Sequence, residues 1–275
     1  SKGGTPVEAW MSEEALADYP EFLEVKERFA QDGYIENLLC AQDKKENAWH
    51  ELLSKKEVET EDAPWNILEV PGWFDKQGLE NFSGLLHLKR TFEVPKELAG
   101  KSAILKMGTL VDSDRIFING EKVGETGYCF PPRLYPVPEG LLKAGENEIF
   151  IRLECRDGKG RITPDKPCDV CFESGEKISL RGTWDYQVRV VSEQAPTLTF
   201  ITRQPTGMYQ GMVAPCTNMT VKGALWYQGE SNEWYPESYE DLIQKMILDW
   251  RARWKQEELP FVVIQLPACG MDNRG

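Results

Sequence analysis

The stretch KGALWYQGESN, residues 222–232, joins an apolar run to a polar turn and decides how the rest of the chain is read. The run KGALWY, 222–227, predicts a strand that is buried on both faces. An apolar stripe from Tyr239 to Trp254 predicts a helix, with Ser238 and Asp241 as its capping pair. The run FVVIQL, 261–266, predicts a second buried strand. Strand, helix and strand in this order predict a βαβ unit, and therefore a parallel sheet.

Two parallel strands do not form a stable sheet alone, because parallel sheets need several strands with both faces covered. We therefore group residues 192–275 with residues 1–62, where a helical pattern runs from Pro20 to about Glu57 and is interrupted at Asp32-Gly33. The fold class predicted for these segments is α/β with an incomplete parallel sheet. The strands are too few for a whole domain, which predicts that further parts of it lie outside this sequence.

Residues 63–191 show a different pattern, with apolar residues at every second position and frequent turn residues. Strands are predicted around 86–92, 103–107, 116–123, 148–153 and 184–190. Asn119-Gly120 predicts a two-residue hairpin within the third of these segments. Short strands without helices between them predict an inserted all-β sandwich.

The bulk properties exclude several classes of protein. The net charge of −13 comes mainly from residues 1–62, where we expect the acidic side chains on solvated helical faces. No basic stripe is present to neutralise phosphates, so nucleic acid is not an expected partner. No apolar run is long enough for a membrane span, and no signal peptide opens the chain. Seven scattered cysteines predict no disulfide framework, and Cys168 and Cys171 are read as buried thiols or a local disulfide. No metal or cofactor is expected.

Chemistry is expected at the end of the strand 222–227. Gln228 follows this strand, where ligands bind in open α/β sheets, and its amide could donate to an oxyanion. The alternative is a loop in which Gln228 and Glu230 only satisfy backbone groups. Ser231 lacks the G-x-S-x-G context of a nucleophile. The chain contains only His50, in the acidic helical stretch, and His87, in the predicted sandwich, and neither stands at a strand end of the α/β segments.

A second candidate for an oxyanion device is the opening SKGGTPVEAW, residues 1–10, because paired glycines let backbone N–H groups point into a crevice. The segments GGTPVEAW, PTGMYQGM, LWYQGESN and LPF occur in an order that resembles the sialate O-acetylesterase family. Residues 63–191, with VPGWF, RTFEVP and DSDRIFING, are similar to the galactose-binding-like jelly roll of that family.

The resemblance implies a flavodoxin-like, SGNH-type carbohydrate esterase that removes O-acetyl groups from sialic acid or related sugars with serine, histidine and aspartate. It places Gly3, Gly4 and Gln228 in the oxyanion hole and Glu230 in support of the site. Trp226 and Asn232 are predicted substrate contacts. The substrate implied is an O-acetylated carbohydrate, and the location implied is extracytoplasmic: periplasmic, secreted or lysosomal.

The family's G-Q-S-N and D-x-x-H blocks are absent from the 275 residues, so we expect a fragment that is inactive on its own. A glycan-binding module is the alternative function, with Trp73, Phe74 and Tyr128 as its aromatic platform. A purely structural insertion without exposed aromatic side chains is a third possibility.

Overall fold

The computed structural model describes residues 4–59, 63–232 and 235–266. It is a mixed α/β structure with several antiparallel sheets and one small parallel sheet. Contacts divide the chain into two compact units. Unit 1 consists of Ser1–Gln42 and Leu198–Gly275, and unit 2 is the continuous segment Asp43–Thr197.

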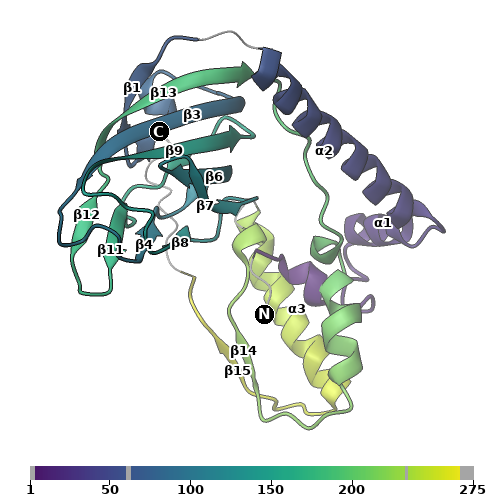
Figure 1. Ribbon diagram of the computed structural model, residues 1–275. Helices are drawn as coiled ribbons and strands as arrows, with labels where there is room; N and C mark the ends of the chain where they lie inside the picture. The colour runs from purple at the N-terminus through teal and green to yellow at the C-terminus, as the bar shows by residue number, and fades with distance from the viewer. Residues whose placement is uncertain (1–3, 60–62, 233–234, 267–275) are drawn as a thin grey trace. The chain divides into compact units, whose positions relative to one another are not determined.

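Unit 2 contains three antiparallel sheets (Figure 1). The largest has the order β1-β13-β3-β9-β6-β7, with the strands Asn66–Val70, Gly182–Val191, Gly84–Val94, Gly145–Cys155, Ser113–Ile118 and Glu121–Thr126. The second has the order β12-β11-β4-β8, with Lys177–Ser179, Asp169–Phe172, Ala103–Lys106 and Leu134–Val137. The third has the order β2-β10-β5, with Gly72–Trp73, Arg161–Ile162 and Leu110–Val111.

The strands predicted in unit 2 are confirmed, because their alternating apolar residues form its core. In β3, for example, Leu86 and Leu88 are both fully buried. The predicted hairpin joins β6 to β7, and Asn119 and Gly120 both have positive φ, as its turn requires.

One charged pair lies inside this core. Arg133 and Asp114 are fully buried, and Arg133 Nε lies 2.6 Å from Asp114 Oδ1. The remaining guanidinium N–H groups donate to backbone carbonyls, among them those of Leu110 and Asp112 at 2.9 Å each. Tyr135 donates to the other carboxylate oxygen of Asp114, so the polar atoms of the pair are satisfied.

The helical pattern before residue 60 forms α1, Pro20–Phe29, and α2, Tyr34–Glu59, with the predicted break between them. The part of α2 from residue 43 onward belongs to unit 2 and packs Trp49 and Leu53 against Leu85 and Val190. Its acidic face was expected in solvent, but this is wrong for two residues.

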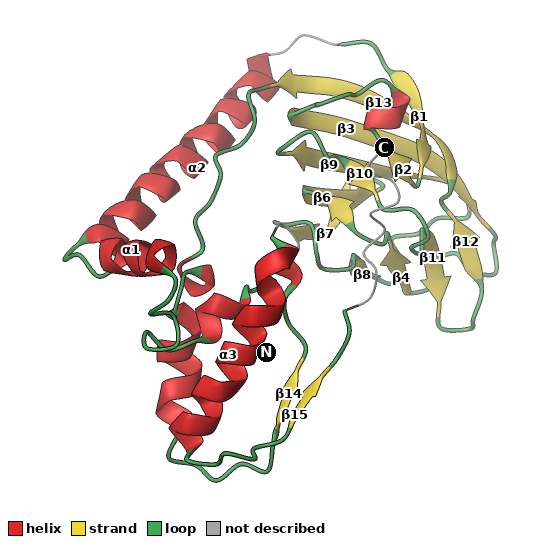
Figure 2. Ribbon diagram, turned by 180° about the vertical axis from the view of Figure 1, so that it is seen from behind, coloured by secondary structure: helices red, strands yellow, loops and turns green. Residues whose placement is uncertain are grey.

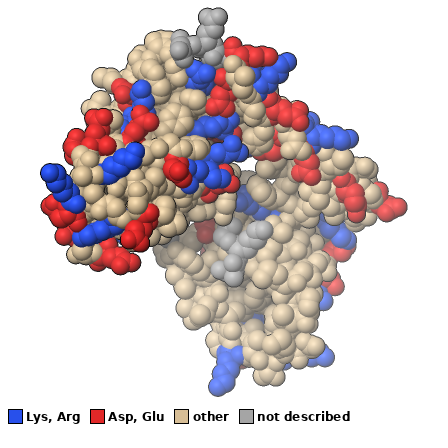
Figure 3. All heavy atoms as spheres, viewed as in Figure 1, with Lys and Arg blue, Asp and Glu red and all other residues tan. Residues whose placement is uncertain are grey.

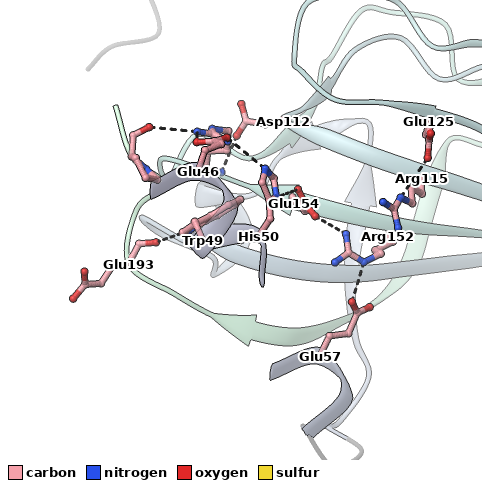
Figure 4. Close-up of polar contacts among 12 residues, drawn as sticks. Glu46, Trp49, His50, Glu57, Asp112, Arg115, Glu125, Arg152, Glu154 and Glu193 are labelled. Carbon is pink, nitrogen blue, oxygen red and sulfur yellow. Dashed lines mark hydrogen bonds and ion pairs between the residues drawn. The ribbon is translucent and has the colours of Figure 1, made fainter. Parts of the chain in front are cut away.

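Those two residues, Glu46 and Glu57, form ion pairs with arginines of unit 2 (Figure 4). The Arg156 guanidinium donates to Glu46 Oε2 at 2.9 Å, and Arg152 Nε donates to Glu57 Oε2 at 2.9 Å. Arginines at the end of β9 and just after it therefore fix this half of the helix on the sheet, which the sequence pattern alone did not indicate.

Unit 1 contains the predicted βαβ unit. The strands β14, Ala224–Trp226, and β15, Phe261–Val263, pair in parallel, and α3, Pro236–Trp254, connects them (Figure 2). The predicted burial of both strand faces is wrong for the described residues, since Leu225 is 78% exposed and Val262 is 54% exposed. In Figure 3 the atoms over these two strands are mostly uncharged.

The core of unit 1 joins α3 to segments from both ends of the chain. Leu242 and Met246 of α3 pack with the short 3₁₀ helix η1, Val7–Trp10, and with Met208 and Tyr209. The remaining short helices are η3, Ile201–Arg203, η4, Tyr209–Val213, η5, Ala214–Cys216, and η6, Glu230–Asn232. In unit 2, η2 spans Asp75–Gln77.

Two local predictions need correction. Ser238 and Asp241 do not cap α3: the helix begins at Pro236, Ser238 donates to the Tyr235 carbonyl, and Asp241 accepts from Tyr19. Phe74 is buried in the core of unit 2 and offers no platform to a sugar. Of the two interpretations given for Cys168 and Cys171, the thiols are confirmed: both are free, Cys168 is fully buried and Cys171 is partly buried, and no local disulfide joins them.

Candidate oxyanion-binding site

The loop after β14 is shaped by Gly229, whose φ is +125°. A Cβ atom at this position would lie 2.7 Å from the hydroxyl oxygen of Tyr239. Tyr239 in turn donates to the Gln228 carbonyl at 2.8 Å and accepts from Trp226 Nε1 at 3.2 Å. Glycine is therefore required for the loop to pass close to α3.

Gln228 is 5% exposed and its side chain is held in one orientation by Thr5. Its Oε1 accepts from Thr5 Oγ1 at 2.7 Å and from the Thr5 backbone N–H at 3.4 Å. The Thr5 hydroxyl accepts from Trp10 Nε1 at 2.8 Å, so its own proton is directed to Gln228. Because the two ends of an amide point in different directions, the Gln228 NH₂ group faces away from Thr5.

Gly4 lies beside the same loop, with a φ of +68°. Its carbonyl accepts from Ser231 Oγ at 2.5 Å. This bond uses the Ser231 hydroxyl proton for a backbone contact, in keeping with the rejection of Ser231 as a nucleophile. Gly3 lies outside the described residues.

Asn232 is 1% exposed and connects the loop to η1. Its Oδ1 accepts from the Val7 backbone N–H at 2.9 Å, and its Nδ2 donates to Glu8 Oε2 at 3.0 Å. Both ends of the amide, predicted as a substrate contact, are thus engaged within unit 1.

Glu8 is a buried carboxylate that no motif in the sequence indicates. Burial raises the pKa of Glu8 above the ordinary glutamate value, against the lowering effect of hydrogen bonds from its own backbone N–H and from Asn232. Thr5 and Glu8 both lie in the segment 1–10, but in that segment only the paired glycines form a pattern that indicates chemistry. The sequence therefore did not predict a role for Thr5 or Glu8.

The other two predicted site residues differ in exposure. Trp226 is buried, with its ring edge-on to Trp10 and Trp250 at centroid distances of 5.9 and 6.2 Å. Glu230 is exposed at the start of η6. The roles predicted for Trp226, Glu230 and Asn232 stay predictions.

A pocket of about 230 Å³ lies at the carboxyl ends of β14 and β15. It is lined by Gly229, Asn232, Pro236, Tyr239 and residues 263–266. This is the edge of a parallel sheet at which ligands bind in open α/β folds.

The two histidines of the sequence both lie in unit 2 beside carboxylates. His87 Nε2 is 2.7 Å from Glu57 Oε1, and His50 Nδ1 is 3.3 Å from Glu154 Oε2. Over the described ranges, no cluster of histidine, cysteine or acidic side chains has the makings of a metal site. No helix in the described part of the chain is long and apolar enough to span a membrane.

Known proteins are similar to parts of this chain. Sialate O-acetylesterase of Mus musculus is 44% identical over 74 residues, which are 24% of this chain and 14% of the mouse protein. The Homo sapiens protein of the same name is 36% identical over 67 residues, 22% of this chain and 13% of the human protein. The matches thus span about one seventh of the length of these relatives.

Among solved structures, the β-glucuronidase of Ruminococcus gnavus aligns with 47% of this chain and 30% of its own, at 11% identity and a TM-score of 0.27. Residues 192–274 match the family described as carbohydrate esterase, sialic acid-specific acetylesterase. This match contains the PTGMYQGM, LWYQGESN and LPF segments, and it confirms the predicted resemblance over residues 192–274. GGTPVEAW and the motifs of residues 63–191 lie outside the match. Residues 192–274 are therefore a segment of the sialic acid-specific acetylesterase family of carbohydrate esterases.

Proposed function

We propose that the protein containing this chain hydrolyses O-acetyl esters of sialic acid or related sugars, and that unit 1 supplies the oxyanion-binding side of its site. Ester hydrolysis passes through a tetrahedral intermediate whose carbonyl oxygen becomes negative, and fixed N–H donors stabilise that charge. The proposed donors are the Gln228 NH₂ group and the backbone N–H groups of Gly4 and Gly3. We assign Glu230 to the support of the site, and Trp226 and Asn232 to its substrate side.

The observation that carries the proposal is the orientation of Gln228. Thr5 holds its amide oxygen, so the amide need not reorganise when negative charge develops on a substrate. The loop stands at the carboxyl end of a parallel strand, beside a pocket, in a segment that matches an esterase family. The two hydrogen bonds from Thr5 to Gln228 Oε1 therefore orient the Gln228 NH₂ group as a donor beside this pocket.

The test is Gln228→Ala in the whole protein, with an aryl acetate and an O-acetylated sialoside as substrates. Loss of one oxyanion donor lowers kcat by about 10²–10³-fold, with KM little changed. Gln244→Ala is the matched control, because Gln244 is an exposed glutamine in α3. An unchanged kcat in Gln228→Ala would refute the assignment.

The nucleophile and its base are proposed to come from outside these 275 residues. Ser231 donates to a backbone carbonyl, and both histidines pair with carboxylates in unit 2. We expect this chain alone to release no acetate above a buffer control, whereas the whole protein does. Turnover by the purified chain, retained after gel filtration, would contradict this expectation.

We further propose that residues 1–62 and 192–275 form part of an SGNH-type, flavodoxin-like sheet and that residues 63–191 are an inserted galactose-binding-like jelly roll. The parallel pairing of β14 with β15 and the antiparallel sheets of unit 2 support this division. The exception is the part of α2 from residue 43 onward, which packs within unit 2. An extracytoplasmic location is proposed with it, and fractionation of cells that express the whole protein tests that location.

A second candidate function is glycan binding by unit 2, favoured by exposed aromatic side chains. Tyr128 is 59% exposed and Phe130 is 77% exposed in the loop before β8, and Phe130 lines a pocket together with Lys106 and Lys166. Trp73 is covered on one face by Arg161, at 4.4 Å from the ring centroid. Titration of the chain and of its Phe130→Ala variant with sialosides and galactosides tests this function: equal affinities for both proteins would exclude Phe130.

A further inference from the structure

Glu8 is a charged side chain in an apolar place. It is 4% exposed, and its neighbours Val7 and Ala9 are fully buried in the core of unit 1. Burying a carboxylate costs free energy unless hydrogen bonds compensate it. In the described part of the chain its charge is compensated by hydrogen bonds and not by a cation. A residue of this kind calls for an explanation other than core stability.

The orientation of the Asn232 amide gives that explanation. The Val7 backbone N–H can only donate, so the atom that faces it must be Asn232 Oδ1, at 2.9 Å. The Nδ2 end must then face Glu8, whose Oε2 lies 3.0 Å away and must accept. An ionised Glu8 meets this requirement with either oxygen, whereas a proton on Oε2 would set two donors against each other.

Asn232 also closes the turn that follows Gln228. Its backbone N–H donates to the Gly229 carbonyl at 2.9 Å. Three side chains of residues 228–232 make hydrogen bonds to residues 4–8: Gln228 to Thr5, Ser231 to Gly4, and Asn232 to Val7 and Glu8. Of the side chains in these contacts, only that of Glu8 can carry a charge.

We infer that Glu8 is a positioning residue of the proposed oxyanion site: through Asn232 its carboxylate holds the turn 229–232, and with it Gln228, in place. This inference rests on the proposed function for its consequence in catalysis, but the geometry that it describes can be measured without turnover.

Protonation of Glu8 should weaken the contact, because a charge-assisted hydrogen bond becomes a neutral one. Burial raises the pKa of Glu8, so this change falls at a higher pH than for an exposed glutamate. Tyr235 is a titratable neighbour whose pKa is raised by burial and then by the charge of Glu8. It therefore stays neutral throughout the acidic range in which Glu8 titrates.

The test uses the full chain with ¹⁵N-labelled asparagine and glutamine, and follows the side-chain amide signals of Asn232 and Gln228 by NMR from pH 7.5 to pH 4. The Asn232 signals should shift with a midpoint above that of an exposed glutamate. Glu8→Gln should abolish the titration, because it keeps an acceptor oxygen but cannot ionise. The control Glu14→Gln removes an exposed glutamate of unit 1 and should leave the titration intact.

Glu8→Ala removes the acceptor as well, and should raise the solvent exchange of the Gln228 side-chain amide at least tenfold, whereas Glu8→Gln should stay within threefold of the wild type. A titration that persists in Glu8→Gln, or a Gln228 amide unaffected in a folded Glu8→Ala, would overturn the inference. If Gln228→Ala lowers kcat while Glu8→Ala leaves Gln228 unchanged, the proposed function stands and this inference fails. If the titration behaves as expected but Gln228→Ala keeps full activity, this inference stands and the proposed function fails.

Discussion

Substitution of Gly229 by alanine should destabilise the loop after β14 through two separable effects. The first is the backbone, because a φ of +125° is open to glycine and costs other residues about 1–3 kcal/mol. The second is overlap with Tyr239, whose ring and hydroxyl atoms would lie 2.7–2.8 Å from the new Cβ.

Tyr239 can relieve the overlap by turning away, but it then loses its hydrogen bonds to the Gln228 carbonyl and from Trp226 Nε1. Two such bonds are worth about 1–3 kcal/mol together. We take this cost as the steric part of the effect, because a Tyr239 side chain that turns away removes the overlap. The total expected for Gly229→Ala is therefore about 2–6 kcal/mol of local stability.

Hydrogen–deuterium exchange of peptides from β14 and the following loop measures this local free energy. The control is Gly211→Ala, since a Cβ there meets no atom within 4 Å, and its effect should stay below about 1 kcal/mol. In a Tyr239→Ala background, Gly229→Ala should lose its steric part and become about 1–3 kcal/mol less costly. Equal costs in both backgrounds, within about 0.5 kcal/mol, would refute the assigned role of Tyr239.

Three further predictions concern unit 2. Arg133→Met leaves the Asp114 carboxylate buried without its cation and should cost about 3–5 kcal/mol in urea unfolding; a loss under 1 kcal/mol would contradict a structural role for the pair. Hydrogen bonds from Arg156 hold the pKa of Glu46 below its usual range. The stability that Glu46 adds to the packing of α2 on unit 2 is therefore present above the unfolded-state pKa of Glu46, and it is lost as pH falls through the folded-state pKa. The protection factors of α2 amides, which compare each exchange rate with the intrinsic rate at the same pH, should therefore fall between about pH 5 and pH 3, and Glu46→Gln should remove most of this dependence. Burial raises the pKa of the Cys168 thiol to about 12, so iodoacetamide at pH 8 should leave Cys168 unmodified in the native chain and modify it in urea, as mass spectrometry would show.

Elements set by local chemistry could be predicted from the sequence. The Asn119-Gly120 hairpin, the break between α1 and α2, and the strand–helix–strand order of unit 1 follow from neighbouring residues and their spacing. Each of these features depends on backbone preference or periodicity within a short window. For that reason they needed no knowledge of the tertiary structure.

Features that depend on distant partners could not be predicted in this way. Glu46 and Glu57 have the sequence context of a solvated helical face, and only their arginine partners, about 95 or more residues further along the chain, reveal their role. Glu8 is similar, because its burial depends on a packing arrangement that no local pattern encodes. The apolar sequence of β14 was correctly read as a strand, but periodicity does not show which of its faces the described chain covers.

The hydrogen bond between Glu8 and Asn232 can form only after the ribosome has synthesised both residues. The two residues are 224 positions apart, and all of unit 2 is translated between them. At a rate of about 5–20 residues per second, a ribosome needs roughly 10–45 s to deliver Asn232 after Glu8. During that interval the apolar segment around Val7 and Trp10 has no α3 to pack against, while unit 2 can already fold as a continuous chain. We therefore expect chaperones that shield nascent chains to bind this segment, and we expect slow synthesis between the two halves to lengthen its exposure.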